Sequence, residues 1–262
     1  MVARNGVVAL VLFALVAMIG CGDDNGPSGE LGLAGDAQYS AVTSQLDQTN
    51  DWMNDQIEDA FATMPSGNSL DDIFMSSIGA DSVNASDWTV LYHSNLSASV
   101  TTTIIDSIQY RNDGQVQYQP LGADQINYRH VTTQVDGDTT NGYTNYTNRT
   151  DVTISALDAQ MAVLNGTSSL NLQTRNGATW REYNIDLAAE GLNMNKVGQG
   201  QWNSSCPSTG TITATIELSI STSGAAPVTE NWTATIVYNE GDATVTVMKS
   251  ELSASYSQNC QL

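Results

Sequence analysis

The two histidines are the first residues to consider for chemistry, because histidine is the usual general base of hydrolytic sites. His93 and His130 are the only histidines among 262 residues. Both lie in stretches that alternate like a β-strand, at positions that we assign to the polar face, so we expect them to be solvent-exposed. The sequence has no GxSxG, HExxH, P-loop or GxGxxG motif, although a Ser-His-Asp arrangement stays open. We therefore predict no catalytic residue, no enzymatic activity and no cofactor.

The loop "DGDTTNG" at 136–142 holds the second group of candidate residues. Asp136, Asp138 and Asn141 offer oxygen ligands of the kind that Ca²⁺ binds. An EF-hand loop needs glycine at its sixth position, whereas Gly142 stands at the seventh. A hairpin turn accounts for the same residues. The three side chains are therefore weak metal candidates, and we expect no metal site.

The first twenty residues differ in composition from the rest of the chain. Arg4 precedes an uninterrupted apolar run at 7–19, and no acidic residue occurs before Asp23. The run is shorter than the roughly 20 residues that span a bilayer as a helix. It is typical of a secretory signal, so we expect residues 1–20 to be a signal peptide outside the folded domain.

This segment ends in Met18, Ile19, Gly20 and Cys21. The four residues resemble the lipobox of bacterial lipoproteins, in which two apolar or small residues and then Gly or Ala precede an invariant cysteine. The resemblance implies a type II signal peptide that is removed before Cys21, and a Cys21 that carries lipid and anchors the protein to a membrane of the cell envelope. Gly22, in place of aspartate, favours the outer membrane. A transmembrane anchor and an ordinary signal with a chance cysteine are the alternatives.

Assigning Cys21 to lipid leaves Cys206 and Cys260 as an even pair. An exported protein matures in an oxidising compartment, so we predict a disulfide between them, with two buried thiols as the alternative. Closing this loop contributes about 4 kcal/mol in the chain-entropy model. The disulfide requires the last segment to fold back at 247–252, because both cysteines must then reach the same end of the sheet.

The remaining residues divide into a tether and one domain. Residues 21–36 are rich in Gly, Asp and Ser and are typical of a flexible tether. Residues 37–262 form the domain, helical over 37–79 and antiparallel β over 86–262. Apolar residues recur at spacings of three, four and seven until Pro65, which predicts a long amphipathic helix over about 37–64. A shorter helical candidate follows from Ser69.

The second part of the chain has a period of two. "TITATIELSI" at 211–220 places Ile, Ala and Leu on one face and Thr, Glu and Ser on the other. Turn signals such as "RNDG" at 111–114 separate about ten to twelve such runs. We predict a mainly β (α+β) fold: a large antiparallel meander sheet, curved like a half-barrel, with the N-terminal helix packed on its apolar face. A β-sandwich is the alternative.

The predicted arrangement looks like the half-open barrel of periplasmic lipoprotein carriers and their lipid-anchored relatives. Eight Lys and Arg stand against 28 Asp and Glu, a net charge of −20, which disfavours nucleic acid and anionic headgroups as partners. Our first hypothesis is a non-enzymatic, lipid-anchored binding or carrier module for a hydrophobic ligand or an envelope protein. The second is an envelope glycan-active hydrolase or glycan-binding module. Its sugar groove would use Tyr143, Tyr146, Trp180 and Trp202.

Overall fold

The structure is a computed structural model of the whole chain. It describes residues 32–63, 82–83, 87–137, 142–197, 201–202, 207–222, 224–240 and 242–259. Cys21, Cys206 and Cys260 lie outside these ranges, as do the expected signal peptide, nearly all of the expected tether, and the helical candidate after Ser69. Their assignments stay predictions, except that the boundary of the tether at residue 36 is wrong: Leu33 is buried in the core and Asp36 pairs with Lys249, so the domain begins at Gly32 among the described residues.

The described residues form one short 3₁₀ helix, one α-helix and thirteen strands. The helices are η1 (Leu33–Gly35) and α1 (Tyr39–Ala62). The first strands are β1 (Ser82–Val83), β2 (Thr89–Ser97), β3 (Val100–Asn112), β4 (Gln115–Gln117), β5 (Gln125–Asp136), β6 (Tyr143–Ser155) and β7 (Met161–Asn176). The others are β8 (Thr179–Val197), β9 (Gln201–Trp202), β10 (Thr209–Thr222), β11 (Val228–Asn239), β12 (Asp242–Lys249) and β13 (Leu252–Asn259).

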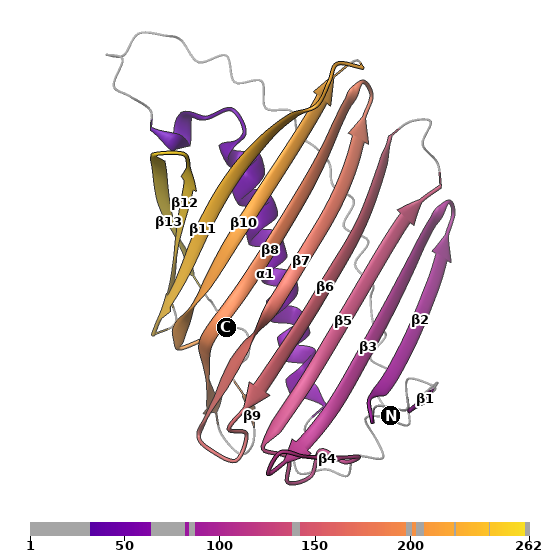
Figure 1. The fold of residues 1–262 in the computed structure, drawn as a ribbon, viewed down its shortest axis with the longest axis vertical. Helices are drawn as coiled ribbons and strands as arrows, with labels where there is room; N and C mark the ends of the chain where they lie inside the picture. The colour runs from indigo at the N-terminus through magenta and orange to yellow at the C-terminus, as the bar shows by residue number, and fades with distance from the viewer. Residues whose placement is uncertain are drawn as a thin grey trace. The chain divides into compact units, whose positions relative to one another are not determined.

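The strands form an antiparallel meander in which neighbours in sequence pair in space. The order is β1-β2-β3-β5-β6-β7-β8-β10-β11-β12-β13, with β4 added to β3 and β9 added to β8. The sheet is not closed, because β1 and β13 stand at its two ends (Figure 1). The predicted mainly β meander is therefore confirmed, and the alternative β-sandwich is wrong.

Helix α1 lies on one face of this sheet, behind the strands in the view of Figure 1. Its fully buried side chains recur at helical spacing, as expected for an apolar stripe against a sheet. They are Val42, Leu46, Met53, Ile57 and Ala60. The predicted helix over 37–64 thus begins at Tyr39 and ends at Ala62, shortly before Pro65.

Local sequence explains the tight turns and one close approach. Asp113 and Gly114 both have positive φ, 50° and 74°, as a two-residue hairpin of the I′ type requires, so the "RNDG" turn is confirmed. Gly166 stands at a register shift between β7 and β8, where a Cβ would lie 2.4 Å from the backbone oxygen of Asp151. Only glycine fits this contact.

The C-terminal segment folds back as predicted. β12 and β13 form a hairpin with Ser250 and Glu251 at its turn. Register along β10 to β13 then places Thr209 and Asn259 at the same end of the sheet. These are the strand residues nearest in sequence to Cys206 and Cys260, so the predicted fold-back is present, while the disulfide stays a prediction.

None of the helices in the described ranges combines the length and the apolar character needed to cross a bilayer.

Candidate functional site

A row of directly opposed residues crosses the helix-facing side of the sheet, and its side chains change from polar to apolar halfway across. Strand register aligns Asp106 (β3), His130 (β5), Thr150 (β6) and Ser168 (β7). The same row continues on the other strands as Leu187 (β8), Ala214 (β10), Ala234 (β11) and Val247 (β12). Directly opposed side chains lie within contact distance of each other. The row is therefore polar over β3–β7 and apolar over β8–β12.

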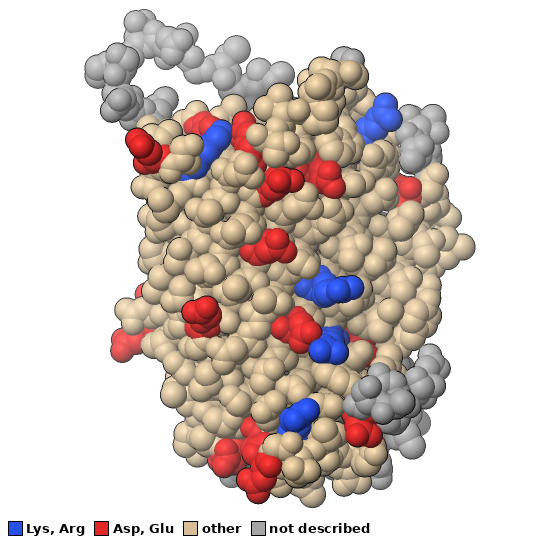
Figure 2. All heavy atoms as spheres, viewed as in Figure 1, with Lys and Arg blue, Asp and Glu red and all other residues tan. Residues whose placement is uncertain are grey.

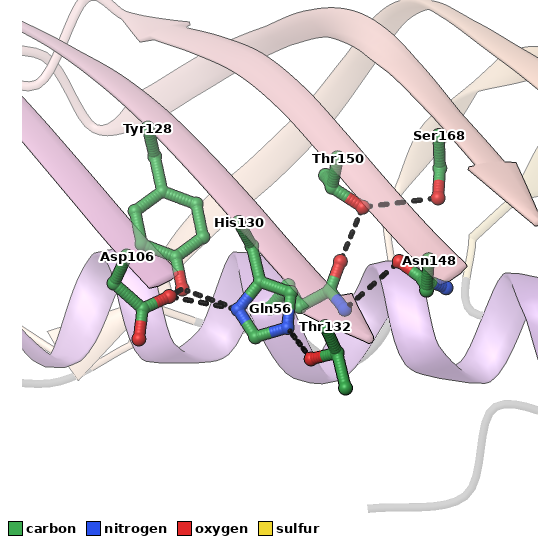
Figure 3. A network of polar contacts seen from close by, with 8 residues as sticks. All are labelled: Gln56, Asp106, Tyr128, His130, Thr132, Asn148, Thr150 and Ser168. Carbon is green, nitrogen blue, oxygen red and sulfur yellow. Dashed lines mark hydrogen bonds and ion pairs between the residues drawn. The ribbon is translucent and has the colours of Figure 1, made fainter. Parts of the chain in front are cut away.

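The polar half contains a hydrogen-bonded group around His130, made of Asp106, Tyr128, His130 and Thr132, which we call the relay (Figure 3). Nδ1 of His130 lies 2.7 Å from Oδ1 of Asp106, and its Nε2 lies 2.5 Å from Oγ1 of Thr132. Tyr128 donates its hydroxyl to the same Asp106 oxygen at 2.6 Å. The side chain of His130 is 10% exposed and that of Asp106 is 25% exposed. The imidazole is thus fixed at both nitrogens while solvent still reaches the carboxylate.

The relay links a carboxylate, an imidazole and a hydroxyl in the same sequence as the catalytic residues of a nucleophilic site. Asp106 orients an imidazole whose other nitrogen faces a hydroxyl, which is the arrangement that activates Ser or Thr for acyl transfer. Assigning the ring proton to Nδ1, beside the carboxylate, leaves Nε2 to accept the proton of Thr132.

A second cluster joins α1 to the sheet through Gln56 (Figure 3). Gln56 donates through Nε2 to Oδ1 of Asn148 at 3.3 Å and accepts from the hydroxyl of Thr150. Thr150 lies 2.9 Å from the hydroxyl of Ser168. The four side chains are buried, and Nδ2 of Asn148 has no hydrogen-bond partner among the described atoms. A buried donor without a partner costs about 1 to 3 kcal/mol, so it points to a further acceptor at this place.

The N-terminal half of α1 meets the other half of the sheet. Asn50 donates to the hydroxyl of Tyr238 on β11 at 3.1 Å. Asp47 accepts from Tyr256 at 2.5 Å and from Gln258 at 2.6 Å, both on β13. The helix therefore crosses the sheet obliquely, from β13 at its N-terminal half to β6 and β7 at Gln56.

One side of α1 carries carboxylates four residues apart, at Asp47, Asp51, Asp55 and Asp59. The pKa of each is raised, first because the carboxylate is partly withdrawn from water. Neighbouring carboxylates raise it further in the last three, and for Asp59 the largest such contribution comes from Asp106 of the relay. The acidic side of the helix thus ends next to the relay.

The structure corrects one prediction about the histidines and confirms the other. His93 is exposed, as expected. The prediction for His130 is wrong, because His130 is only 8% exposed and faces α1. Val135, which lies on the other side of this strand, is 51% exposed. Tyr128, two residues before His130, is buried and sets the true phase.

The four aromatic residues assigned to a sugar groove separate into two pairs. Tyr146 packs against Trp52 with ring centroids 5.2 Å apart, and Trp202 stacks on Phe61 at 5.3 Å, so both contact α1. Tyr143 and Trp180 lie together on the opposite face of the sheet, by the alternation of β6 and β8. The single groove proposed from sequence is therefore wrong.

The acidic loop of the sequence analysis is described only in part. Asp138 and Asn141 lie outside the described residues. Asp136 accepts a hydrogen bond from Ser99 at 3.0 Å, and its backbone N–H donates to Asn145 at 2.7 Å. Within the described ranges no group of three or more His, Cys, Asp or Glu side chains could hold a metal ion.

Sequence reasoning missed Asp106, Thr132 and Gln56. The only local signal was the H-x-T spacing of His130 and Thr132, which puts both side chains on one face of a strand. Asp106 comes from β3 and Gln56 comes from α1, and their positions against β5 and β6 are not visible in the sequence.

Comparison with known proteins gives no match for this chain among family models, curated proteins or solved structures.

Proposed function

We propose that this chain is a lipid-anchored protein of the cell envelope that binds a hydrophobic ligand, or an apolar segment of an envelope partner, without catalysing a reaction. The observation that carries the proposal is an open sheet whose largely apolar face is covered by a single helix. An antiparallel sheet with one apolar face must close, pair with another sheet or be covered. Here α1 is the cover, and it is a separable one.

Helix α1 can move without disturbing strand pairing. In the described chain it makes no backbone hydrogen bond to a strand, and its polar contacts to the strands are side-chain bonds, among them those of Asp47, Asn50 and Gln56. Moving α1 away would expose the apolar part of the row from Leu187 to Val247. A ligand of similar apolar area could replace the helix on this surface at little net cost, because hydrophobic burial depends on area and not on direction.

Two buried donors indicate the chemistry of the ligand. Nδ2 of Asn148 and Nε1 of Trp232 are buried on the helix-facing side and lack a partner among the described atoms. Both are donors only. A ligand with carbonyl or ester oxygens between apolar chains, such as an acylated lipid, would supply acceptors to them. The anchor at Cys21 would keep the domain beside the membrane that contains such molecules.

Native mass spectrometry of residues 22–262, purified without the anchor from the envelope of the source cell, tests the proposal. We expect a retained mass of a few hundred to about a thousand daltons that is released by organic solvent. Uptake of an NBD-labelled phospholipid from vesicles gives a second readout. A ligand-free domain that also takes up no labelled lipid would contradict the proposal.

A pair of variants on α1 separates ligand binding under the helix from adsorption elsewhere. Gln56→Ala removes the bonds to Asn148 and Thr150, so we expect faster uptake of the labelled lipid. Glu58→Ala, on the exposed side of the same turn, serves as the control and should take up lipid at the rate of the unmodified protein. Equal rates for all three proteins would place the lipid away from α1.

The relay around His130 favours a second candidate function, ester hydrolysis in the envelope. Oγ1 of Thr132 would attack an ester carbonyl carbon and pass its proton to Nε2 of His130, while Asp106 stabilises the imidazolium. The departing alkoxide would take that proton, and water would then hydrolyse the acyl-threonine. A glycosidase needs two carboxylates across a cleft, whereas the relay offers one carboxylate and one hydroxyl.

Hydrolysis of p-nitrophenyl butyrate tests this second candidate. We expect turnover to be lost in Thr132→Val and retained in Thr133→Val, which changes the neighbouring threonine on the opposite face of β5. Turnover that is absent, or equal in the two variants, removes the candidate and leaves the binding function unaffected.

A further inference from the structure

Two aromatic side chains flank an arginine on the face of the sheet that is turned away from α1. Tyr143 on β6 lies directly opposite Arg175 on β7, and Arg175 lies directly opposite Trp180 on β8. Two strand spacings separate Tyr143 from Trp180, about 10 Å. Arg175 is exposed and the two rings are half-buried. The guanidinium is held at the β7–β8 turn, where its Nε donates to the oxygen of Gly177 at 3.3 Å.

A ladder of amides and carboxylates adjoins this aromatic row on the same face. Gln173 and Asn171 on β7 both donate to Oε1 of Glu182 on β8, at 3.0 and 2.9 Å. Asn171 also donates to Asn184 at 2.6 Å, and Asn184 donates to Oε1 of Glu217 on β10 at 3.4 Å. The described contacts of both glutamates use only Oε1, so the second oxygen of each can accept from a ligand.

We infer that these residues form a binding platform for a neutral oligosaccharide. Aromatic rings offer apolar faces to the C–H surfaces of a sugar, while a fixed set of donors and acceptors orients its hydroxyl groups. Two rings about 10 Å apart suit a chain of sugars better than one unit. The ladder is preorganised by its own hydrogen bonds, which lowers the entropic cost of binding.

Charge decides between classes of glycan. The platform carries Arg175 against Glu182 and Glu217, and the whole chain has a net charge of −20. A polyanionic glycan would be repelled, whereas the hydroxyls of a neutral glycan can pair with amides, carboxylates and guanidinium alike. Figure 2 shows this face of the molecule, with a few charged side chains scattered among uncharged ones.

The composition of the platform differs from that of the β10–β13 part of the same face. Beyond β8 the outward residues are mainly hydroxyl side chains, for example the row of Thr213, Thr235, Thr246 and Ser255 across β10–β13. Threonine is explained there by its preference for strands. Strand propensity does not explain the amide and carboxylate ladder, because Asn and Glu are depleted in strands.

The platform is independent of the function proposed for the other face. It shares no residue with α1 or with the relay. Lipid binding and glycan binding can therefore each be present or absent without the other. A glycan site on a lipid-anchored domain would connect the membrane to a polysaccharide layer.

Isothermal titration of residues 22–262 with chitohexaose, cellohexaose and maltohexaose tests the inference. We expect saturable binding of at least one of them, weakened roughly tenfold or more in Trp180→Ala and in Tyr143→Ala. Asn171→Ala should weaken binding with both rings intact. Tyr92→Ala is the matched control, because Tyr92 is a 49% exposed tyrosine on the same face at β2, and it should bind like the unmodified protein.

Thermal melting of each variant confirms folding before titration, so a misfolded variant is not counted. Binding that survives in the double variant Trp180→Ala/Tyr143→Ala would overturn the inference. Failure to bind any of the three hexasaccharides, or binding of polygalacturonate alone, would also overturn it.

Discussion

The two halves of the sheet under α1 differ, although one row of opposed residues runs through both. Over β8–β12 the row is Leu187, Ala214, Ala234 and Val247, and all four side chains are buried. Over β3–β7 the same row carries hydroxyls, an imidazole and a carboxylate that bond to one another and to Gln56. The apolar residues of the row offer the helix no directional partner, whereas the polar residues pair with one position of the helix, at Gln56.

This difference separates stability from specificity. Apolar burial supplies the driving force for docking α1, because it scales with area and lacks direction. The polar half adds less free energy but helps to fix the register of the helix on the sheet, since a shifted Gln56 would leave Asn148 without its partner and Thr150 with Ser168 alone.

The largest expected effect comes from a core truncation in the apolar half. Leu46→Ala should lower the free energy of unfolding by about 2 to 5 kcal/mol, because Leu46 is fully buried and its removal leaves a cavity. Urea unfolding followed by circular dichroism measures it. Leu252→Ala, at a 51% exposed leucine, is the control and should change stability by less than about 0.5 kcal/mol.

The next effect comes from the polar half. Gln56→Ala should cost about 1 to 3 kcal/mol, because it leaves two buried groups on β6 without their partner. The same unfolding measurement applies, with Glu58→Ala as the exposed control. A loss equal to that of Leu46→Ala would erase the contrast between the halves.

A smaller effect is expected at the ion pairs beside η1. Nζ of Lys249 lies 2.8 Å from Asp36 and 2.9 Å from Glu230, and above the ring of Trp232. Lys249→Met should cost about 1 kcal/mol at pH 7, because it keeps the apolar stem and removes the charge.

The cost of Lys249→Met should depend on pH. Hydrogen bonds from Lys249 and from the backbone of Gln38 lower the pKa of Asp36. A carboxyl whose pKa is lower in the folded state stabilises the fold above its ordinary pKa, and this contribution is lost as pH falls through the lowered value. The difference in stability between the two proteins should therefore shrink below about pH 4. A difference independent of pH would argue against the ion pair.

The smallest effect is a gain on the acidic side of α1. The pKa of Asp55 is raised by partial burial and then by Asp51 and Glu58. A carboxyl with a raised folded-state pKa stabilises the fold below its ordinary pKa and loses that contribution as pH rises. Asp55→Asn should therefore raise stability by about 0.3 kcal/mol at pH 7.

This gain should vanish as the pH approaches 4, where Asp55 itself becomes neutral. Melting temperatures at pH 7 and pH 4.5 measure both values. Glu190 is an exposed acid on β8 with no other acidic residue within three positions of it in the sequence. Glu190→Gln is therefore the control for removing a carboxylate that has no such neighbour. A destabilised Asp55→Asn at pH 7 would contradict the assigned cause.

The apolar half of the molecule could be predicted from sequence, and the polar half could not. Alternation in "TITATIELSI" and turn signals such as "RNDG" are local, and they predict strand type and the meander, with about ten to twelve strands where the described residues form thirteen. The phase of β5 differs from the expectation, because His130, which we assigned to the polar face, lies on the buried face with Tyr128. The opposition of Asp106 and His130 depends on the register of β3 against β5, which no local pattern encodes.

The fold-back of β12 and β13 also followed from sequence, through the requirement that two cysteines meet. The structure confirms the hairpin, while the disulfide itself stays a prediction, because both cysteines lie outside the described residues.

The position of η1 has a mechanical consequence. Leu33 is buried, and Asp36 is joined through Lys249 to the end of β12. Force applied to the chain ahead of Gly32 would therefore load this contact and the terminal hairpin first. Because α1 follows η1 directly in the chain and makes no backbone hydrogen bond to a strand in the described residues, the helix would be pulled from the sheet next, before the centre of the sheet lost its pairing.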